Sequence, residues 1–320
     1  MNVRISFQAL KARNGDLRSE TRAIKVALSV IARLQRSVVF GYVSLGRWPR
    51  LLHFAPLALK APTPVEMSIL ETFKLDDKVA LVTGASTGLG QAIAIALAEA
   101  GADVACHGNT HAPDETCDAI TKLGHKAFAV TGDLSDHATP RHLIDNTIAH
   151  FGRLDILVNN AGTIRRSPAI EYSEEDWAAV IEVNLSSVFR LSQLAGRHMI
   201  ERGGGKILNI ASLLSFQGGI TVPAYAAAKG GVAQLTKALA NEWAAKNVNV
   251  NAIAPGYMRT NNTKALQQDE TRNRQILERI PAGRWGEPAD LGGAAVFLCS
   301  AASDYVNGHV MVVDGGWMGR

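Results

Sequence analysis

Cysteine is scarce in this chain of 320 residues. Its three cysteines, Cys106, Cys117 and Cys299, are scattered and odd in number, and none lies in the CxxC or His-rich spacing that binds metals. The sequence therefore offers neither a disulfide framework nor a metal-ligand motif. We expect reduced thiols, a cytoplasmic location and no bound metal.

Long uncharged apolar runs are also missing near the amino terminus. Within residues 37–59 the longest uncharged run, residues 37–46, has ten residues, whereas a helix that spans a bilayer needs about 20. No early apolar core followed by a small-residue cleavage site marks a secretory signal. The sequence predicts a soluble protein with no membrane partner.

Acidic residues are rare in residues 1–66, which hold eleven Lys and Arg against three Asp and Glu. This segment has a net charge of +8, which leaves −4 for the rest of a chain whose total is +4. The basic charge thus belongs to the amino-terminal extension. No basic patch interleaved with aromatic residues predicts a nucleic-acid partner.

Two interpretations of the basic extension follow. Its residues 23–39 can form a basic amphipathic helix, as in a transit peptide or a membrane-surface helix. Alternatively, translation begins at Met67, and residues 1–66 are a misassigned start without a fold of their own. We favour the second interpretation, which leaves one domain over residues 67–320, and the 47% hydrophobic content of the chain is ample for its core.

A strand, a glycine-rich loop and a helix are expected in direct succession. Residues 79–83 are a continuous apolar run suited to a central parallel strand, and a helix is expected over residues 91–99. Between them, Gly84, Gly88 and Gly90 have the spacing GxxxGxG. Glycines let a backbone approach a pyrophosphate closely, and a helix amino end offers it free N–H groups. We interpret the loop as a cofactor site; the alternative is a tight turn without a ligand.

Further apolar runs predict six more strands. They are residues 103–107, 126–131, 155–159, 206–212, 248–254 and 310–314, with helices expected over residues 173–202 and 287–301. The sequence predicts an α/β fold, a single Rossmann-type doubly wound parallel sheet of about seven strands with helices on both faces.

A serine, a tyrosine and a lysine form a candidate acid/base device. A tyrosine has an unperturbed pKa of about 10, so it exchanges protons near neutrality only beside a positive charge. Tyr225 and Lys229 are four residues apart and share one face of a helix. Ser212 ends a predicted strand, where ligands bind in open α/β sheets, and can donate to the same substrate oxygen. The alternative is a half-buried tyrosine beside a solvated lysine.

The order and spacing of the glycine loop, Ser212, Tyr225 and Lys229 resemble the short-chain dehydrogenase/reductase family. The resemblance covers residues 67–320, and the opening of this range is similar to the lead-in of such enzymes. The segments similar to a sugar-acid branch of the family are residues 87–91, 162–166, 215–219, 241–243, 254–258, 261–263 and 279–286.

This resemblance implies a reaction and an assembly. The reaction is hydride transfer between NAD(H) and a keto or hydroxy sugar acid of the 2-dehydro-3-deoxy-D-gluconate or 2-deoxy-D-gluconate type, in hexuronate or pectin catabolism. The assembly is a homotetramer.

The resemblance also implies roles for individual residues. Tyr225 exchanges the proton, Ser212 polarises the reacting oxygen, and Lys229 lowers the tyrosine pKa and binds the nicotinamide ribose. Asn184 holds a water that relays protons to the lysine, or is simply a buried amide at a helix kink. The expected cofactor-binding residues are Gly84, Ser86, Thr87, Gly88, Leu89, Gly90, Asp133, Leu134, Asn160, Ala161, Gly162, Tyr225, Lys229, Pro255, Gly256 and Thr260.

The end of the second predicted strand bears on which nicotinamide cofactor binds. NAD enzymes often place an acid there for the ribose hydroxyls, whereas NADP enzymes use arginine. Residues 108–111, Gly-Asn-Thr-His, match neither pattern, and Thr87 stands where a basic residue would help to hold a 2′-phosphate. We predict NAD because no Arg or Lys is nearby, with NADP as the alternative.

Substrate contacts are expected at the mouth of the site. Paired arginines are usually solvated, but here their forked donors can meet a substrate carboxylate. The candidate substrate residues are Arg165, Arg166, Ser212, Gln217 and Asn261. The polar residues 257–285 predict an irregular, mobile lid, or else an ordinary surface excursion.

Two other functions stay open at this point. One is another short-chain reductase, such as a 3-oxoacyl-carrier-protein reductase acting on an acyl thioester. The other is a catalytically silent nucleotide-binding protein, against which the intact set of Asn184, Ser212, Tyr225 and Lys229 argues. The expected partner is a small anionic sugar acid.

Overall fold

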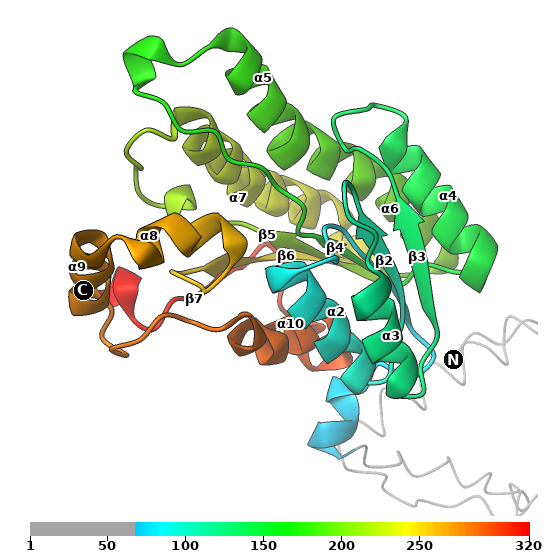
Figure 1. Cartoon of the computed structure of the whole chain (residues 1–320). Coiled ribbons are helices and arrows are strands. Elements are labelled where there is room, and N and C mark those ends of the chain that lie inside the picture. The colour runs from blue at the N-terminus through cyan, green and yellow to red at the C-terminus, as the bar shows by residue number, and fades with distance from the viewer. Residues whose placement is uncertain (1–67) are drawn as a thin grey trace, which may run out of the picture. The chain divides into compact units, whose positions relative to one another are not determined.

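Seven parallel strands form the centre of the computed structural model, which describes residues 68–320. Across the sheet they follow the order β3-β2-β1-β4-β5-β6-β7 (Figure 1). Their bounds are β1 Val79–Val82, β2 Asp103–Gly108, β3 Ala127–Thr131, β4 Ile156–Asn159, β5 Gly205–Ile210, β6 Val248–Pro255 and β7 Val310–Val313. Each lies within two residues of a predicted run, and the predicted doubly wound parallel sheet is confirmed. The interpretation of residues 1–66 lies outside the described residues.

The order of the strands creates a topological switch point at the carboxyl ends of β1 and β4. β1 and β4 are neighbours, with Leu81 opposite Leu157, although β2 and β3 separate them in sequence. All four residues of each strand are buried, because helices cover both faces of a parallel sheet. The chain leaves the carboxyl ends of β1 and β4 in opposite directions, and such a switch point is where α/β sheets bind ligands.

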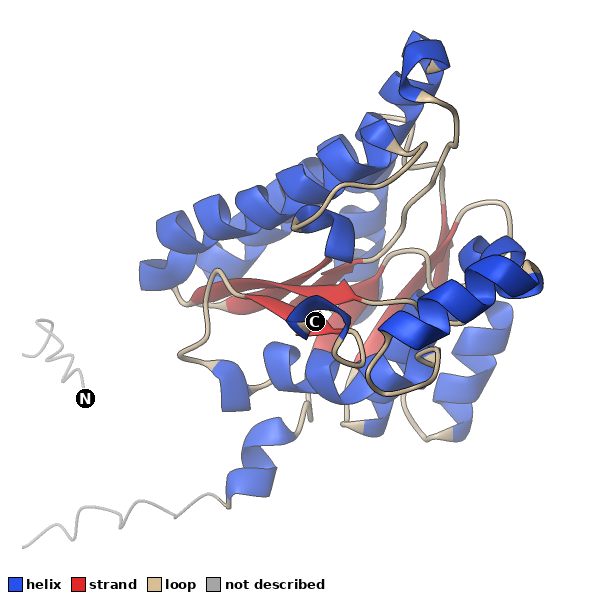
Figure 2. Cartoon of the chain, turned by 90° about the vertical axis from the view of Figure 1, so that its left-hand side faces the viewer, coloured by secondary structure: helices blue, strands red, loops and turns tan. Residues whose placement is uncertain are grey.

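Helices pack on both faces of the sheet, above and below the strands in Figure 2. On one face lie α2 Gly88–Glu99, α3 Asp114–Lys122 and α10 Gly292–Cys299, and on the other α4 Thr139–Phe151, α6 Ser187–Arg202 and α7 Pro223–Trp243. Their apolar residues form two clusters, one around Ile93 and Leu97 and one around Leu191 and Trp243. No helix within residues 68–320 is both long enough and apolar enough to cross a membrane.

The helix predicted over residues 173–202 is interrupted by a π-helical turn. α5 Glu174–Ile181 is capped by Ser173, whose hydroxyl accepts a hydrogen bond from Asp176 N at 3.1 Å. The turn Glu182–Ser186 then leads into α6. Single π-turns inside α-helices are frequent at functional sites, and this one contains Asn184, which is fully buried.

The prediction of an irregular lid over residues 257–285 is wrong in part. The segment forms the short helices α8 Lys264–Gln268 and α9 Glu270–Arg279, which lie beside the carboxyl terminus (Figure 1). The Asp269 side chain caps α9 by accepting from Arg272 N at 3.0 Å. Within α9, Ile276 is buried and belongs to an apolar cluster with the distant Trp317. That contact is not visible in local sequence, which is mostly polar here.

Buried polar side chains join the sheet to the helices above it. The Asn159 amide on β4 donates to Asn209 Oδ1 on β5 at 2.8 Å and to Ser192 Oγ on α6 at 3.1 Å. The Asn209 amide donates in turn to Thr236 Oγ1 on α7 at 2.9 Å. Because each buried amide needs partners of fixed geometry, the chain of bonds sets how α7 lies on the sheet.

We expect Asn209→Leu to lower the free energy of unfolding by about 2–4 kcal/mol, because Asn159 and Thr236 each lose a buried partner. Urea denaturation followed by circular dichroism measures this loss. Asn146→Leu is the matched control, since its amide bonds back to His142 of its own helix; we expect a change within about 0.5 kcal/mol. Equal effects of the two variants would contradict the role of the network.

Candidate active site

The glycine loop after β1 is held from both sides by hydrogen bonds. From β2, His107 accepts from Gly84 N through Nδ1 at 3.2 Å and from Ala85 N through its carbonyl oxygen at 2.7 Å. From α3, Thr116 Oγ1 donates to Ala85 O at 2.7 Å. On the β4 side, Asn160 Nδ2 donates to Gly84 O at 3.1 Å. The loop therefore presents a fixed backbone surface at the switch point.

The same loop has the form of an anion cradle. Within residues 68–320, the N–H groups of Gly88, Leu89 and Gly90 at the start of α2 have no hydrogen-bond partner, and the Thr87 side chain does not cap them. Free donors and the positive dipole end of a helix together favour a phosphate. Gly88 has a φ of 60°, and a Cβ on Gly90 would collide with the carbonyl oxygen of Gly84. The residues present thus fit the pyrophosphate of a dinucleotide.

The segment after β4 lies beside the glycine loop at the switch point. The backbone N–H groups of Asn160 and Ala161 both donate to Thr83 Oγ1, at 3.0 and 3.1 Å. Asn184 Nδ2 donates to Thr163 O at 2.8 Å and to the carbonyl of Val180 at 2.9 Å. Both amide hydrogens of Asn184 are thereby used, so its side chain positions this segment. A water relay at Asn184 stays a prediction.

Lys229 lies deep in the protein with its charge against a carbonyl. Its Nζ donates to Ile210 O at 2.5 Å, and the residue is 4% exposed. Burial lowers the pKa of Lys229 from an ordinary value of 10.5 to about 8. The ammonium lies 5.7 Å from the ring centre of Tyr225, one turn earlier on α7.

Ser212 and Tyr225 come together as the sequence predicts. The Ser212 hydroxyl lies close enough to the Tyr225 phenol to lower its pKa, and it accepts from Leu214 N at 3.2 Å. Burial raises the pKa of Tyr225, and the Ser212 hydroxyl and the charge of Arg166 oppose that rise without cancelling it. The expected lowering of the tyrosine pKa is therefore absent from the protein alone, because desolvation of the phenolate outweighs the nearby donors.

A second serine, Ser215, holds Ser212 and Lys229 in place, and the sequence did not lead us to expect it. Ser215 Oγ donates to the carbonyl of Lys229 at 2.6 Å and accepts from Ser212 N at 3.3 Å. It thus links the end of β5 to the turn of α7 that carries the lysine. The spacing of two serines three residues apart, as in a helix-capping box, is the signal that could have predicted it.

The two candidate arginines have different surroundings. Arg165 Nε lies 3.5 Å from Asp176 Oδ1 on α5, and its Nη1 lies 3.5 Å from Thr163 Oγ1. Arg166 is exposed and forms no ion pair within residues 68–320, yet its charge acts on Tyr225. Arg166 is therefore the arginine that is available to an anion beside the phenol.

Comparisons with known proteins assign the chain to a family. A family model described as Enoyl-(Acyl carrier protein) reductase matches residues 84–318. The 2-dehydro-3-deoxy-D-gluconate 5-dehydrogenase of Dickeya dadantii is 56% identical over 253 residues, which are 79% of this chain and 100% of the relative. The chain belongs to the short-chain dehydrogenase/reductase family. It is accordingly a nicotinamide-dependent oxidoreductase that acts on CH–OH groups.

Solved structures of short-chain dehydrogenases/reductases resemble the fold throughout the matched region. A structure from Agrobacterium tumefaciens, described as a 2-deoxy-D-gluconate 3-dehydrogenase with bound NADP, has a TM-score of 0.73 and 57% identity, and covers 78% of this chain and 99% of that one. A gluconate 5-dehydrogenase from Burkholderia cenocepacia in complex with NADP and tartrate has a TM-score of 0.74 and 42% identity, with the same coverage.

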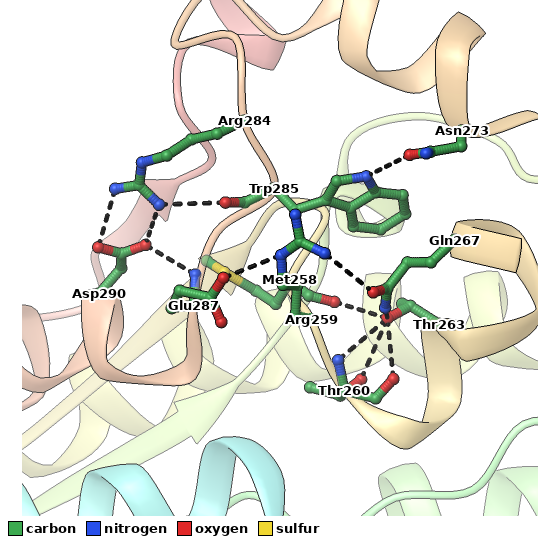
Figure 3. A network of polar contacts seen from close by, with 10 residues as sticks. All are labelled: Met258, Arg259, Thr260, Thr263, Gln267, Asn273, Arg284, Trp285, Glu287 and Asp290. Carbon is green, nitrogen blue, oxygen red and sulfur yellow. Dashed lines mark hydrogen bonds and ion pairs between the residues drawn. The ribbon is translucent and has the colours of Figure 1, made fainter.

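In this short-chain dehydrogenase/reductase, a polar network anchors the lid to the body of the protein (Figure 3). Arg259 pairs with Glu287 at 2.9 Å, and Trp285 Nε1 donates to Asn273 Oδ1 at 2.7 Å. At the start of the lid, the Thr260 methyl group lies 3.7 Å from the position of a Cβ on Gly88. The lid base therefore adjoins the anion cradle.

The remaining predicted residues lie around the same edge of the sheet. Asp133 is exposed, and a hydrogen bond from Ser135 N to its carboxylate, at 2.8 Å, is the main cause of its lowered pKa. Leu134 is a core residue, 3% exposed. Pro255 ends β6, and Gly256 N donates to Val313 O at 2.9 Å. Gln217 is half-buried in the loop after Ser215, and Asn261 is exposed at the base of the lid.

No group of three or more His, Cys, Asp or Glu within residues 68–320 is arranged to hold a metal ion.

The depressed pKa of Lys229 predicts how stability depends on pH. Between pH 8 and 10.5 the unfolded chain still holds the lysine proton while the folded protein has released it, so the stability of the wild type rises with pH in this window. From pH 7 to pH 10, we expect the wild type to gain about 2 kcal/mol of unfolding free energy relative to Lys229→Met. Denaturant melts at both pH values measure the gain, and parallel pH dependences of the two proteins would contradict it.

Proposed function

We propose that this short-chain dehydrogenase/reductase transfers a hydride reversibly between NAD(H) and a ring-opened keto or hydroxy sugar acid, of the 2-dehydro-3-deoxy-D-gluconate or 2-deoxy-D-gluconate type. The observation that carries the proposal is Arg166, which forms no ion pair within residues 68–320 and whose charge acts on the half-buried Tyr225. A substrate with one carboxylate matches that cation. The 56% identity to the Dickeya dadantii sugar-acid dehydrogenase over its whole length supports the same substrate class.

The proton chemistry belongs to Tyr225 and its neighbours. When bound, the cofactor accepts a hydride from the alcohol carbon or delivers one to the ketone carbon. Tyr225 takes the hydroxyl proton in oxidation and returns it in reduction, while Ser212 donates to the reacting oxygen. Lys229, held against Ile210 O, places a positive charge below the phenol and offers its other donors to the nicotinamide ribose.

Arg166 acts on the other end of the substrate. A guanidinium binds a carboxylate with two parallel hydrogen bonds, which fixes orientation as well as position. Closure of the α8–α9 lid removes water and strengthens this pair. Gln217 and Asn261, near the end of β5 and at the lid base, are the proposed contacts for the substrate hydroxyls.

We also infer that NAD is preferred to NADP. Residues 108–111 supply no Arg or Lys for a 2′-phosphate. The hydroxyl of Ser86 in the glycine loop already donates its hydrogen to His111 O at 2.6 Å. The NADP in the Agrobacterium tumefaciens structure is the observation that opposes this inference.

For assembly and location we infer a cytoplasmic homotetramer. The family resemblance supports both, and the exposed Trp177 on α5, Phe189 on α6 and Val312 on β7 offer apolar surface for contacts between subunits.

The absorbance of reduced nicotinamide tests the function directly. Purified full-length protein is given NAD(H) or NADP(H) with the two sugar acids, a neutral sugar alcohol and a 3-oxoacyl thioester. We expect turnover with the sugar acids alone and a higher kcat/KM with NAD. Turnover confined to the thioester or the neutral alcohol would refute the substrate class, and binding of the cofactor without any turnover would favour a silent nucleotide-binding protein.

The proposed contact between Arg166 and the substrate carboxylate leads to a separate prediction. Arg166→Ala should raise KM for the sugar acid by about 10- to 100-fold, the cost of losing a charge-assisted pair of hydrogen bonds. Arg165→Ala is the matched control, because Arg165 already faces Asp176; we expect a change in KM of less than about threefold. Steady-state kinetics that show equal losses in the two variants would contradict the assignment of this contact to Arg166.

A further inference from the structure

A buried histidine at the end of β2 has both ring nitrogens committed. His107 is 1% exposed. Its Nδ1 lies 3.2 Å from Gly84 N, and its Nε2 lies 2.9 Å from Gly132 O. A backbone N–H can only donate and a carbonyl can only accept, so Nδ1 must be bare and Nε2 must carry the proton. Both bonds exist only with the neutral imidazole.

The two bonds join segments that are far apart in sequence. Gly84 opens the glycine loop after β1, whereas Gly132 follows β3 and precedes Asp133. One ring therefore connects the anion cradle to the residue before Asp133 and Leu134, which the family resemblance implies as contacts of the cofactor's adenine. Gly132 N also donates to Gly108 O at 3.2 Å, which keeps the ends of β2 and β3 together.

Other contacts hold this region when the ring bonds are lost. Ala85 N donates to the backbone carbonyl of His107 at 2.7 Å, and Ser86 Oγ donates to His111 O at 2.6 Å. These bonds do not depend on the imidazole. Loss of the ring therefore loosens the orientation of Gly84 and Gly132, while the strands stay paired.

We propose that neutral His107 is a positioning residue for the adenosine half of the nicotinamide cofactor, and that protonation of its ring weakens cofactor binding. This inference rests on the cofactor placement of the proposed function. A proton on Nδ1 would place two hydrogen-bond donors, Nδ1–H and the Gly84 N–H, opposite each other. The protonated ring therefore loses its hydrogen bond to Gly84.

The charges around the ring set the pH at which this occurs. Burial lowers the pKa of His107, and the hydrogen bond to Gly132 and the carboxylate of Asp133 oppose that shift in part. Asp133 is the charged group that acts on the ring. The glycine loop from Gly84 to Gly90 has no ionisable side chain, β3 pairs Val130 with His107, and α3 brings the neutral Thr116 to the loop.

The sign of the pH effect follows from this depressed pKa. The ring is neutral at and above its ordinary pKa of 6.5, so cofactor affinity is constant from about pH 6.5 upward and falls as the pH drops through the lowered value. Asp133 also has a lowered pKa, below its ordinary 3.8. It therefore stays ionised at pH 5 and does not cause the change.

Cofactor affinity at pH 7.5 and pH 5 tests the proposal, with NAD⁺ as the probe and isothermal titration calorimetry as the readout. We expect the Kd of the wild type to be constant from pH 7.5 to about pH 6.5 and to rise at lower pH, as the ring gains a proton. His107→Gln keeps one donor and one acceptor but does not titrate, so it should bind like the wild type at pH 7.5 and lose the pH dependence. His107→Leu should bind about tenfold more weakly at both pH values, because it lacks both bonds.

His198→Leu is the matched control. His198 is another partly buried histidine with a pKa lowered by burial, and it accepts from Leu154 N at 3.3 Å, before β4 and away from the cradle. It should leave both the Kd and its pH dependence unchanged. Circular dichroism confirms that each variant is folded.

The outcomes separate this proposal from the proposed function. A His107→Gln variant that keeps the wild-type pH dependence, or a folded His107→Leu variant with the wild-type Kd, would overturn the proposal. The titration uses no sugar acid, so a wild type that binds NAD⁺ but turns over no sugar acid refutes the substrate assignment alone. A wild type that binds neither NAD⁺ nor NADP⁺ at pH 7.5 refutes the cofactor placement and this proposal together.

Discussion

The buried ammonium of Lys229 is the constraint on which the catalytic side of this structure depends. A cation removed from water needs an oxygen acceptor, and the carbonyl of Ile210 at the end of β5 supplies it. That bond fixes α7 against β5, and Ser215 fastens the same turn from the other side. Ser212 and Tyr225 then meet as a consequence, since one follows β5 and the other lies one turn before the lysine.

The cofactor side of the site is built by the same means, with backbone groups held by side chains. Asn160 and Thr116 donate to carbonyl groups of the glycine loop, and Thr83 accepts from the N–H groups of Asn160 and Ala161. Within residues 68–320, the N–H groups at the start of α2 are left for an anion. The two sides meet at the switch point between β1 and β4. At the base of the lid, Thr260 lies next to Gly88 of the cradle.

Much of this arrangement could be predicted from the sequence because it depends on local patterns. Continuous apolar runs gave the seven strands within two residues, and the spacing of four residues placed Tyr225 and Lys229 on one helix face. Contacts between distant residues were not predictable in this way. The choice of Arg166 over Arg165 depends on Asp176, and the lid helices depend on Trp317. The direction of the tyrosine pKa shift depends on burial, which no spacing reveals.

The central claim is that burial outweighs the influence of Ser212 and Arg166, so that the folded chain alone keeps Tyr225 protonated with a pKa above its ordinary value of 10. Ultraviolet difference titration of the wild type against Tyr225→Phe, without cofactor, measures this pKa. The account predicts a titration above 10. A titration at or below 10 would contradict it.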